Sequence, residues 1–179
     1  MKAMVIVLLL FPALCSASGV LQAWFVPPSA GSNSVSLVLR NTGDDDINIV
    51  EHTLPWLMKN GMLMNSAVMN LTTQDGRWVG YRGAFSEPDL SDPERFVTIK
   101  PGAEKRYVAD MSVNYDIAPG QHYQVTSAMP MKYLDRSLAR YPDRSNAGLR
   151  PLYRRAAATP ASFVASAVIC ADPIGAGSC

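Results

Sequence analysis

The chain has two histidines, His52 and His122, and neither lies in a pattern that builds a catalytic or zinc site. A zinc peptidase of the His-Glu-x-x-His type needs two imidazoles on one face of a helix, and these histidines are far apart in the sequence. The sequence also lacks the Gly-x-Ser-x-Gly turn that exposes a nucleophilic serine. We therefore expect no enzyme activity, no metal site and no cofactor. A hydrolase that depends on either histidine is the less favoured alternative.

Three consecutive aspartates, Asp44, Asp45 and Asp46, are the other residues with metal-binding chemistry. An EF-hand loop binds calcium through carboxylates at alternate positions and a distal glutamate, a spacing that this run does not have. The aspartates come after an Asn-Thr-Gly sequence, which is typical of a turn. We interpret them as part of a solvated turn.

Two segments could form a contact surface for a protein partner, the first because of its apolar and aromatic residues and the second because of the family resemblance described below. Trp and Met are enriched in protein interfaces, and an apolar segment with Trp56 leads into several methionines. Two interpretations of this segment stay open: it covers the end of the core, or it exposes a patch for a partner. The second segment is the loop at residues 82–95. The candidate partner-binding residues are Leu54, Pro55, Trp56, Tyr81 and Arg82.

The N-terminal residues predict export. Lys2 precedes an apolar run at residues 4–10, and small residues come next, as in a signal peptide cleaved after residue 17. The apolar run is too short to span a bilayer. A lipid anchor on Cys15 would need a small residue before it, where this chain has Leu14. We expect residues 1–17 to be a signal peptide and the protein to be secreted or periplasmic.

Cleavage of the signal peptide would leave two cysteines, Cys170 and Cys179. An even number of cysteines in an oxidising compartment predicts a disulfide. A bridge between these two would close the C-terminal tail. Free thiols that bind a partner's metal are the alternative.

Short alternating segments separated by turn residues dominate residues 18–130 and predict an all-β antiparallel sandwich. Val35, Leu37 and Leu39 alternate with smaller residues in one segment. Tyr123 and Val125 alternate in another and are expected to face the core. Asp-Gly at 75–76 and Pro-Gly at 101–102 predict tight turns between strands.

Beyond Pro130 the sequence becomes basic and is interrupted by proline and glycine. We expect residues 131–179 to form an irregular basic connection with a short helix near 133–140, a last strand and the disulfide-closed tail. The whole chain is 48% hydrophobic and 17% charged with net charge +1, a globular composition that points to neither nucleic acid nor a membrane surface.

Several motifs, taken in order, resemble the N-terminal propeptide-like domain of the deuterolysin and peptidyl-Lys metalloendopeptidase (aspzincin) family. The resemblance covers roughly residues 30 to 128. The matching motifs are SLVLRNTGD at 36–44, TLP at 53–55, DGRWVGYRG at 75–83, FVTIKPG at 96–102, DMSVNYD at 110–116 and GQHY at 120–123. Gly80 departs from the pattern, because such domains more often have proline before the tyrosine.

The resemblance implies an immunoglobulin-like sandwich without the zinc peptidase domain that lies after it in that family. A propeptide-like domain acts by binding, so the resemblance implies an inhibitor or folding partner of a secreted metallopeptidase. The alternative is an accessory or surface module that binds another protein or a glycan through the same loops or through the basic residues at 136–155. Fold analogy does not by itself establish which of these holds.

Overall fold

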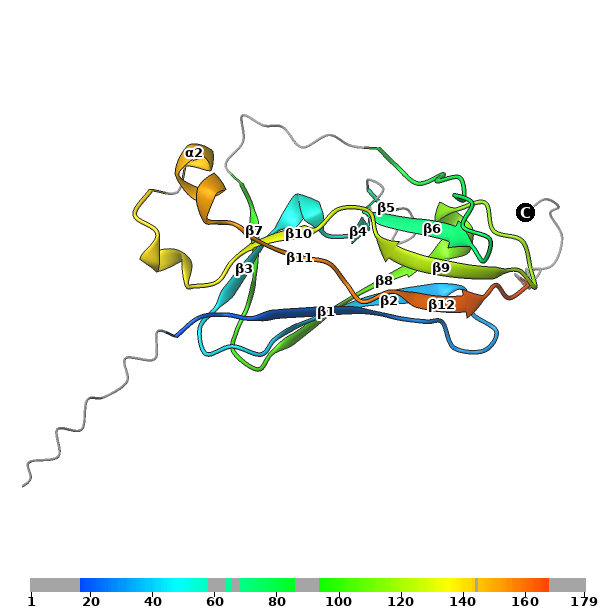
Figure 1. The fold of residues 1–179 in the computed structure, drawn as a ribbon, viewed down its shortest axis with the longest axis horizontal. Coiled ribbons are helices and arrows are strands. Elements are labelled where there is room, and N and C mark those ends of the chain that lie inside the picture. Colours follow the sequence, from blue (N-terminus) through cyan, green and yellow to red (C-terminus); the bar gives the residue numbers. More distant parts are fainter. Residues whose placement is uncertain (1–16, 58–63, 66–67, 86–93, 144, 168–179) are drawn as a thin grey trace, which may run out of the picture.

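Antiparallel strands form three sheets and one short ribbon in the computed structural model, which describes residues 17–57, 64–65, 68–85, 94–143 and 145–167 (Figure 1). The first sheet has the order β1 (Leu21–Val26), β2 (Ser34–Asn41), β8 (Glu104–Asp110). The second has the order β11 (Arg154–Ala156), β10 (Met131–Leu134), β3 (Ile47–Val50), β7 (Phe96–Ile99). The third has the order β12 (Ala161–Val164), β9 (His122–Ser127), β6 (Met69–Thr73). The predicted all-β, sandwich-like fold is confirmed.

The remaining elements are short. The ribbon pairs β4 (Trp56–Leu57) with β5 (Met64–Asn65). The helical turns are η1 (Glu51–Thr53), α1 (Met111–Asn114), η2 (Leu138–Arg140), α2 (Asn146–Leu149) and η3 (Arg150–Leu152). In the described residues, no helix combines the length and the apolar character that crossing a membrane requires.

One hydrophobic core joins the three sheets. Phe25 and Leu37 contribute from the first sheet, Ile49 from the second, and Leu71 and Val125 from the third. In β2 the expected burial of Val35, Leu37 and Leu39 is confirmed, but Val38 on the opposite face is buried as well. Tyr123 and Val125 of β9 face the core as expected. The sheets therefore depend on one another for burial of their apolar faces.

The Pro-Gly turn at residues 101–102 connects two sheets and does not form a hairpin. Gly102 has φ of +73°, a conformation in which a Cβ is strained, so the turn predicted at this position is confirmed. The strands that it joins diverge, however: β7 pairs with β3, and β8 pairs with β2. The Asp-Gly turn also forms, with Gly76 at φ of +82°, but only one bridge, between Thr72 and Trp78, extends it.

Buried asparagines fasten the ends of strands to distant segments. The Asn41 side chain accepts a hydrogen bond from the Val20 amide at 3.2 Å and donates to the Ile99 carbonyl at 3.0 Å. Asn33 donates to the Ser166 carbonyl at 3.0 Å and accepts from its amide at 2.8 Å. These bonds satisfy backbone groups that burial would otherwise leave unpaired.

The helix predicted near residues 133–140 is wrong for its first half. Met131, Tyr133 and Leu134 lie in β10 and are buried, because β10 pairs with β3 on one side and with β11 on the other. Only η2 is helical in this range. Residues after 134 leave the sheet as turns and short helices, and the chain returns to it at β11. The predicted last strand, which alternates from Phe163 to Ile169, overlaps β12 only at Phe163 and Val164. Residues 165–167 are not in a strand, and the rest lies outside the described residues.

Candidate functional site

Leu54 and Pro55, two of the candidate contact residues, are buried. Leu54 is 2% exposed and belongs to the hydrophobic core. The turn η1 directs it inward: the Thr53 hydroxyl donates to the Val50 carbonyl at 2.7 Å, and the Leu54 amide donates to the Glu51 carbonyl at 3.0 Å. Of the two interpretations left open, these two residues therefore agree with the first, in which the segment covers the core. The Trp56 backbone pairs with Asn65, and its side chain is not among those described.

Tyr81 and Arg82, the other candidate residues, are held against α1 and its flanking residues. The Arg82 amide donates to the Asn114 carbonyl at 2.8 Å. The Arg82 guanidinium lies 3.0 Å from the Asp116 carboxylate and 3.1 Å from the Ser112 carbonyl. Arg82 is exposed, but its backbone and its side chain are both bonded to one neighbouring segment. These contacts fix the position of the chain on either side of Arg82.

Tyr81 also holds the chain around Arg82 in place, through contacts with other segments. Its hydroxyl donates to the Met64 carbonyl at 2.7 Å, and its ring packs edge-on against Tyr115 at a centroid distance of 5.4 Å. Tyr115 is buried and donates to the Met69 carbonyl at 2.6 Å. Burial raises the pKa of Tyr81 to about 12, so its hydroxyl remains a donor at any physiological pH.

Two aromatic side chains project from the stretch that Tyr81 and Arg82 anchor. Trp78 is 70% exposed and Phe85 is 77% exposed. The Phe85 ring rests edge-on against Tyr81, with centroids 5.1 Å apart. We call residues 78–85 the aromatic segment. Exposed aromatic rings on a well-anchored backbone are the residues that most often dominate protein binding, because little conformational entropy is lost when they are buried.

Gly83 keeps the aromatic segment tightly turned around the Tyr81 ring. A Cβ at this position would overlap the hydroxyl and the adjoining ring carbons of Tyr81, far inside van der Waals contact. Any other residue would therefore displace the ring or the backbone. Of the predicted contact loop at 82–95, residues 82–85 belong to the aromatic segment, and 86–93 lie outside the described residues.

A turn motif in the sequence lies next to one of the two exposed rings. Trp78 comes two residues after the Asp-Gly turn, where the second arm of a hairpin is expected to begin. In the structure this arm is a single bridge to Thr72 of β6, and the tryptophan side chain stays exposed. Phe85 carries no comparable local signal.

The two histidines lie in different elements, one in a helical turn and the other in a strand. His52 is in η1, and burial lowers its pKa, with Glu94 opposing that effect and Lys132 adding to it. His122 is exposed at the start of β9. Among the residues that the structure describes, no three His, Cys, Asp or Glu side chains are grouped as metal ligands.

In the aspartate turn, Asp46 pairs with Lys100 at 2.8 Å and Asp45 with Arg140 at 3.3 Å.

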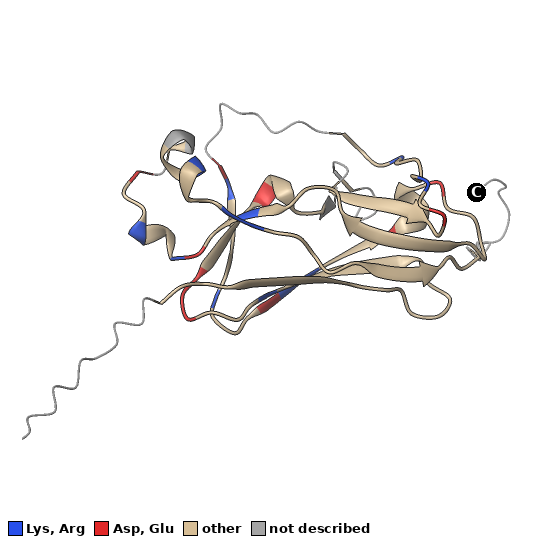
Figure 2. Ribbon diagram, viewed as in Figure 1, with Lys and Arg blue, Asp and Glu red and all other residues tan. Residues whose placement is uncertain are grey.

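The predicted disulfide between Cys170 and Cys179 lies outside the described residues, as do Cys15 and residues 1–16 of the predicted signal peptide. The described basic residues at 136–143 and 145–155 gather at the end of the molecule opposite to β6 and β9 (Figures 1 and 2). Several of them line a cavity between η2, η3 and β11.

No protein-family model matches the chain, and a search of curated proteins found no significant match.

Proposed function

We propose that this chain is an exported, non-catalytic binding protein that contacts a protein partner through the aromatic segment. The observation that carries this proposal is the exposure of Trp78 and Phe85 on a backbone held by Tyr81 and Arg82. Burying such rings removes a large apolar area from water at about 25 cal/mol per Å². Export rests on the signal-like residues 1–17.

The partner that we favour is a secreted metallopeptidase of the aspzincin type. Support comes from the order of motifs that resemble the propeptide-like domain of that family. Two of these motifs contribute residues that hold the fold: Asn41 fastens β2, Asp110 caps α1, and Tyr115 supports Tyr81. The resemblance therefore supports the fold more directly than the partner. Blocking a peptidase cleft requires shape and contact area, and it needs no catalytic residue in the blocking chain.

The decisive experiment measures binding of the mature protein to a purified aspzincin peptidase by calorimetry, together with peptidase activity. Trp78→Ala and Phe85→Ala should each weaken binding by about thirty-fold, since loss of a central aromatic contact costs about 2 kcal/mol. Val164→Ala is the matched control, because Val164 is an exposed apolar residue on β12. Equal affinity in all four proteins, or no binding at all, would contradict the proposal.

The activity measurement separates three roles of such a partner. An inhibitor lowers the peptidase rate in proportion to occupancy. A folding partner leaves the rate of the native enzyme unchanged but raises the yield of active enzyme on refolding. A protein that only binds does neither.

A glycan-binding or other accessory role is the second candidate, and the exposure of the flat Trp78 ring favours it, because sugar faces stack on such rings. A screen of immobilised glycans with wild-type and Trp78→Ala protein tests it. A glycan signal that Trp78→Ala abolishes, without any peptidase binding, would favour this role.

A further inference from the structure

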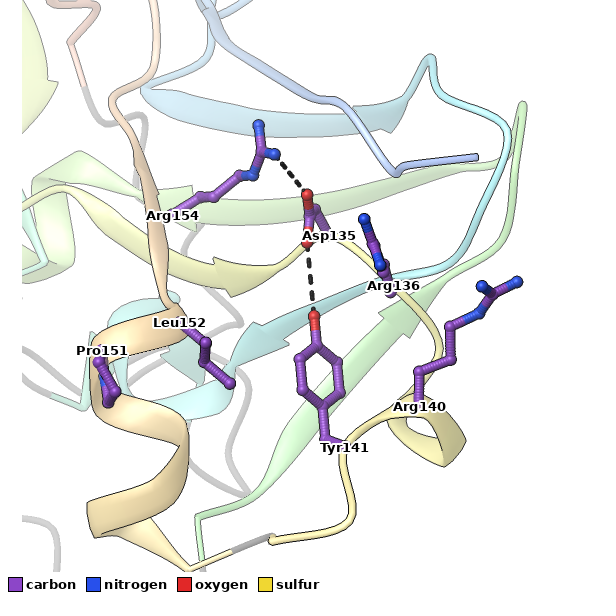
Figure 3. A pocket seen from close by; sticks show the side chains of 7 residues that line it. All are labelled: Asp135, Arg136, Arg140, Tyr141, Pro151, Leu152 and Arg154. Atoms are coloured by element: carbon purple, nitrogen blue, oxygen red, sulfur yellow. Dashed lines mark hydrogen bonds and ion pairs between the residues drawn. The ribbon is translucent and has the colours of Figure 1, made fainter. Parts of the chain in front are cut away.

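A cavity of about 400 Å³ opens between η2, η3, β11 and the residues just after β10. Its lining residues are Asp135, Arg136, Arg140, Tyr141, Pro151, Leu152 and Arg154 (Figure 3). A volume of this size lies at the small end of the range for ligand sites in proteins. It is large enough for one side chain or one small molecule.

The polar side of the cavity carries an excess of positive charge. Three arginines and one aspartate line it. The aspartate, Asp135, has a side chain that is 12% exposed, and Nη2 of Arg154 lies 2.6 Å from its carboxylate. Tyr141 donates to the same carboxylate at 3.4 Å. The negative group of the cavity is thus already paired.

Arg140 is positioned by contacts outside the cavity. Its Nε lies 3.3 Å from the Asp45 carboxylate, which also accepts a hydrogen bond from the Ser137 amide at the start of η2. Arg140 approaches its aspartate through Nε, and Arg154 approaches its own through Nη2. A guanidinium has five N–H donors in a planar fork, so it can hold a second carboxylate at the same time.

The other side of the cavity is apolar. Leu152 is 47% exposed, and it stands beside Pro151 on η3. In Figure 3 these two side chains lie on one side of Tyr141 and Arg136 and Arg140 on the other, while Asp135 lies beyond the Tyr141 hydroxyl with Arg154 next to it. Buried Leu149 ends α2 just before this wall and anchors it. Cations at one end and an apolar wall at the other are complementary to an anion on an apolar stem.

We propose that this cavity binds a carboxylate carried on a short apolar stem. A carboxylate on an apolar stem fits better than a phosphate, because Pro151 and Leu152 offer a phosphate nothing to contact. The site is separate from the aromatic segment and does not depend on the function proposed for it. The source of the carboxylate is either a small organic acid or a peptide that ends in an aliphatic residue.

Calorimetry of the mature protein with five probes tests the ligand class. Hexanoate should bind, whereas hexan-1-ol, which has the same stem without charge, and inorganic phosphate should bind at least about tenfold more weakly. A pentapeptide ending in leucine is compared with its C-terminal amide: tighter binding of the free acid than of hexanoate identifies a peptide source, and the reverse identifies a small acid. Phosphate or hexanol binding as tightly as hexanoate would overturn the proposal.

Three variants test the residues. Arg140→Gln should weaken hexanoate binding about tenfold or more, and the loss should shrink as salt is added. Arg77→Gln is the matched control, since Arg77 is an exposed, ion-paired arginine in the Asp-Gly turn. Equal weakening in both variants would show a nonspecific effect of charge and would overturn the site.

Leu152→Ser keeps the test decisive if Arg140→Gln fails to fold, because an exposed leucine contributes little to stability. It should weaken hexanoate binding several-fold and leave acetate binding unchanged. Unchanged hexanoate binding in this variant would overturn the apolar wall as part of the site.

Discussion

The segment around Leu54 and the aromatic segment look alike in sequence, since each combines apolar and aromatic residues next to a turn, yet the structure uses them in opposite ways. Leu54 and Pro55 are buried, whereas Trp78 and Phe85 are the most exposed large hydrophobic residues in the described part of the chain. The two segments differ in the path of the chain after each turn. After η1 the chain passes into the core, while after the Asp-Gly turn it bonds to α1 and leaves its rings outside.

Among the substitutions considered, one in the core should lower the free energy of unfolding the most. We expect Leu54→Ala to lower the free energy of unfolding by about 2–5 kcal/mol, because it leaves a cavity among residues that cannot fully close it. Urea unfolding of the mature protein measures this. Leu152→Ala, at an exposed leucine, is the control and should change stability by less than about 0.5 kcal/mol. Similar losses in both variants would contradict the assignment of Leu54 to the core.

The second largest effect should be a loss of stability at alkaline pH, where the tyrosines that anchor the aromatic segment ionise. Burial raises the pKa of Tyr81 to about 12 and raises that of Tyr115 further, with a smaller contribution from Tyr81. An unfolded tyrosine ionises at a pKa near 10. Their contribution to stability is therefore complete below about pH 10 and is lost as the pH rises through 12, by at most about 1.4 kcal/mol per pH unit for each group.

Unfolding measured at pH 9, 10 and 11 checks this dependence. Tyr81→Phe should make the fall in stability with pH less steep, and absorbance titration should show one fewer late-ionising phenol. Tyr107, whose pKa burial also raises to about 12, contributes the same background to both proteins. An unchanged slope in Tyr81→Phe would mean that this hydroxyl is not held as described.

The ion pair that orients the aromatic segment should contribute less to the free energy of unfolding. Arg82 and Asp116 lie 3.0 Å apart, and their side chains are 55% and 60% exposed. Because exposed pairs contribute about 0–1 kcal/mol, Arg82→Gln should lower stability by no more than that, and added salt should reduce the difference. Arg77→Gln, at another exposed pair, provides the comparison by thermal unfolding. A loss of several kcal/mol on changing Arg82 would place it in the folding core.

The exposed rings should contribute least to stability. Trp78→Ala and Phe85→Ala should each change the free energy of unfolding by less than about 0.5 kcal/mol. Circular dichroism melting curves measure this on the proteins used for the binding experiments. If either variant unfolds much more readily, its ring packs onto the protein in solution, and the contrast with Leu54 no longer holds.

More of the fold than of the candidate site could be predicted from the sequence. The alternation of Val35, Leu37 and Leu39 predicted their burial, because successive side chains of a strand point to opposite faces. The turns at Gly76 and Gly102 were predictable for an equally local reason: they need a backbone conformation that glycine adopts without strain. β10 was missed because its Met-Lys-Tyr-Leu sequence becomes a strand only when β3 and β11 pair with it.

The sequence by itself determined the properties that depend on neighbouring residues: the β class, the positions of turns, the basic character of residues 136–155, and the absence of spaced histidine ligands. Only the tertiary structure decided which apolar residues meet water. Exposure depends on which distant segment covers a side chain, as the core covers Leu54 and nothing covers Trp78 in the part that the structure describes. It also decided that Arg140 of η2 and Arg154 of β11 share one cavity with Leu152, because the return of the chain from η2 to β11 brings them together.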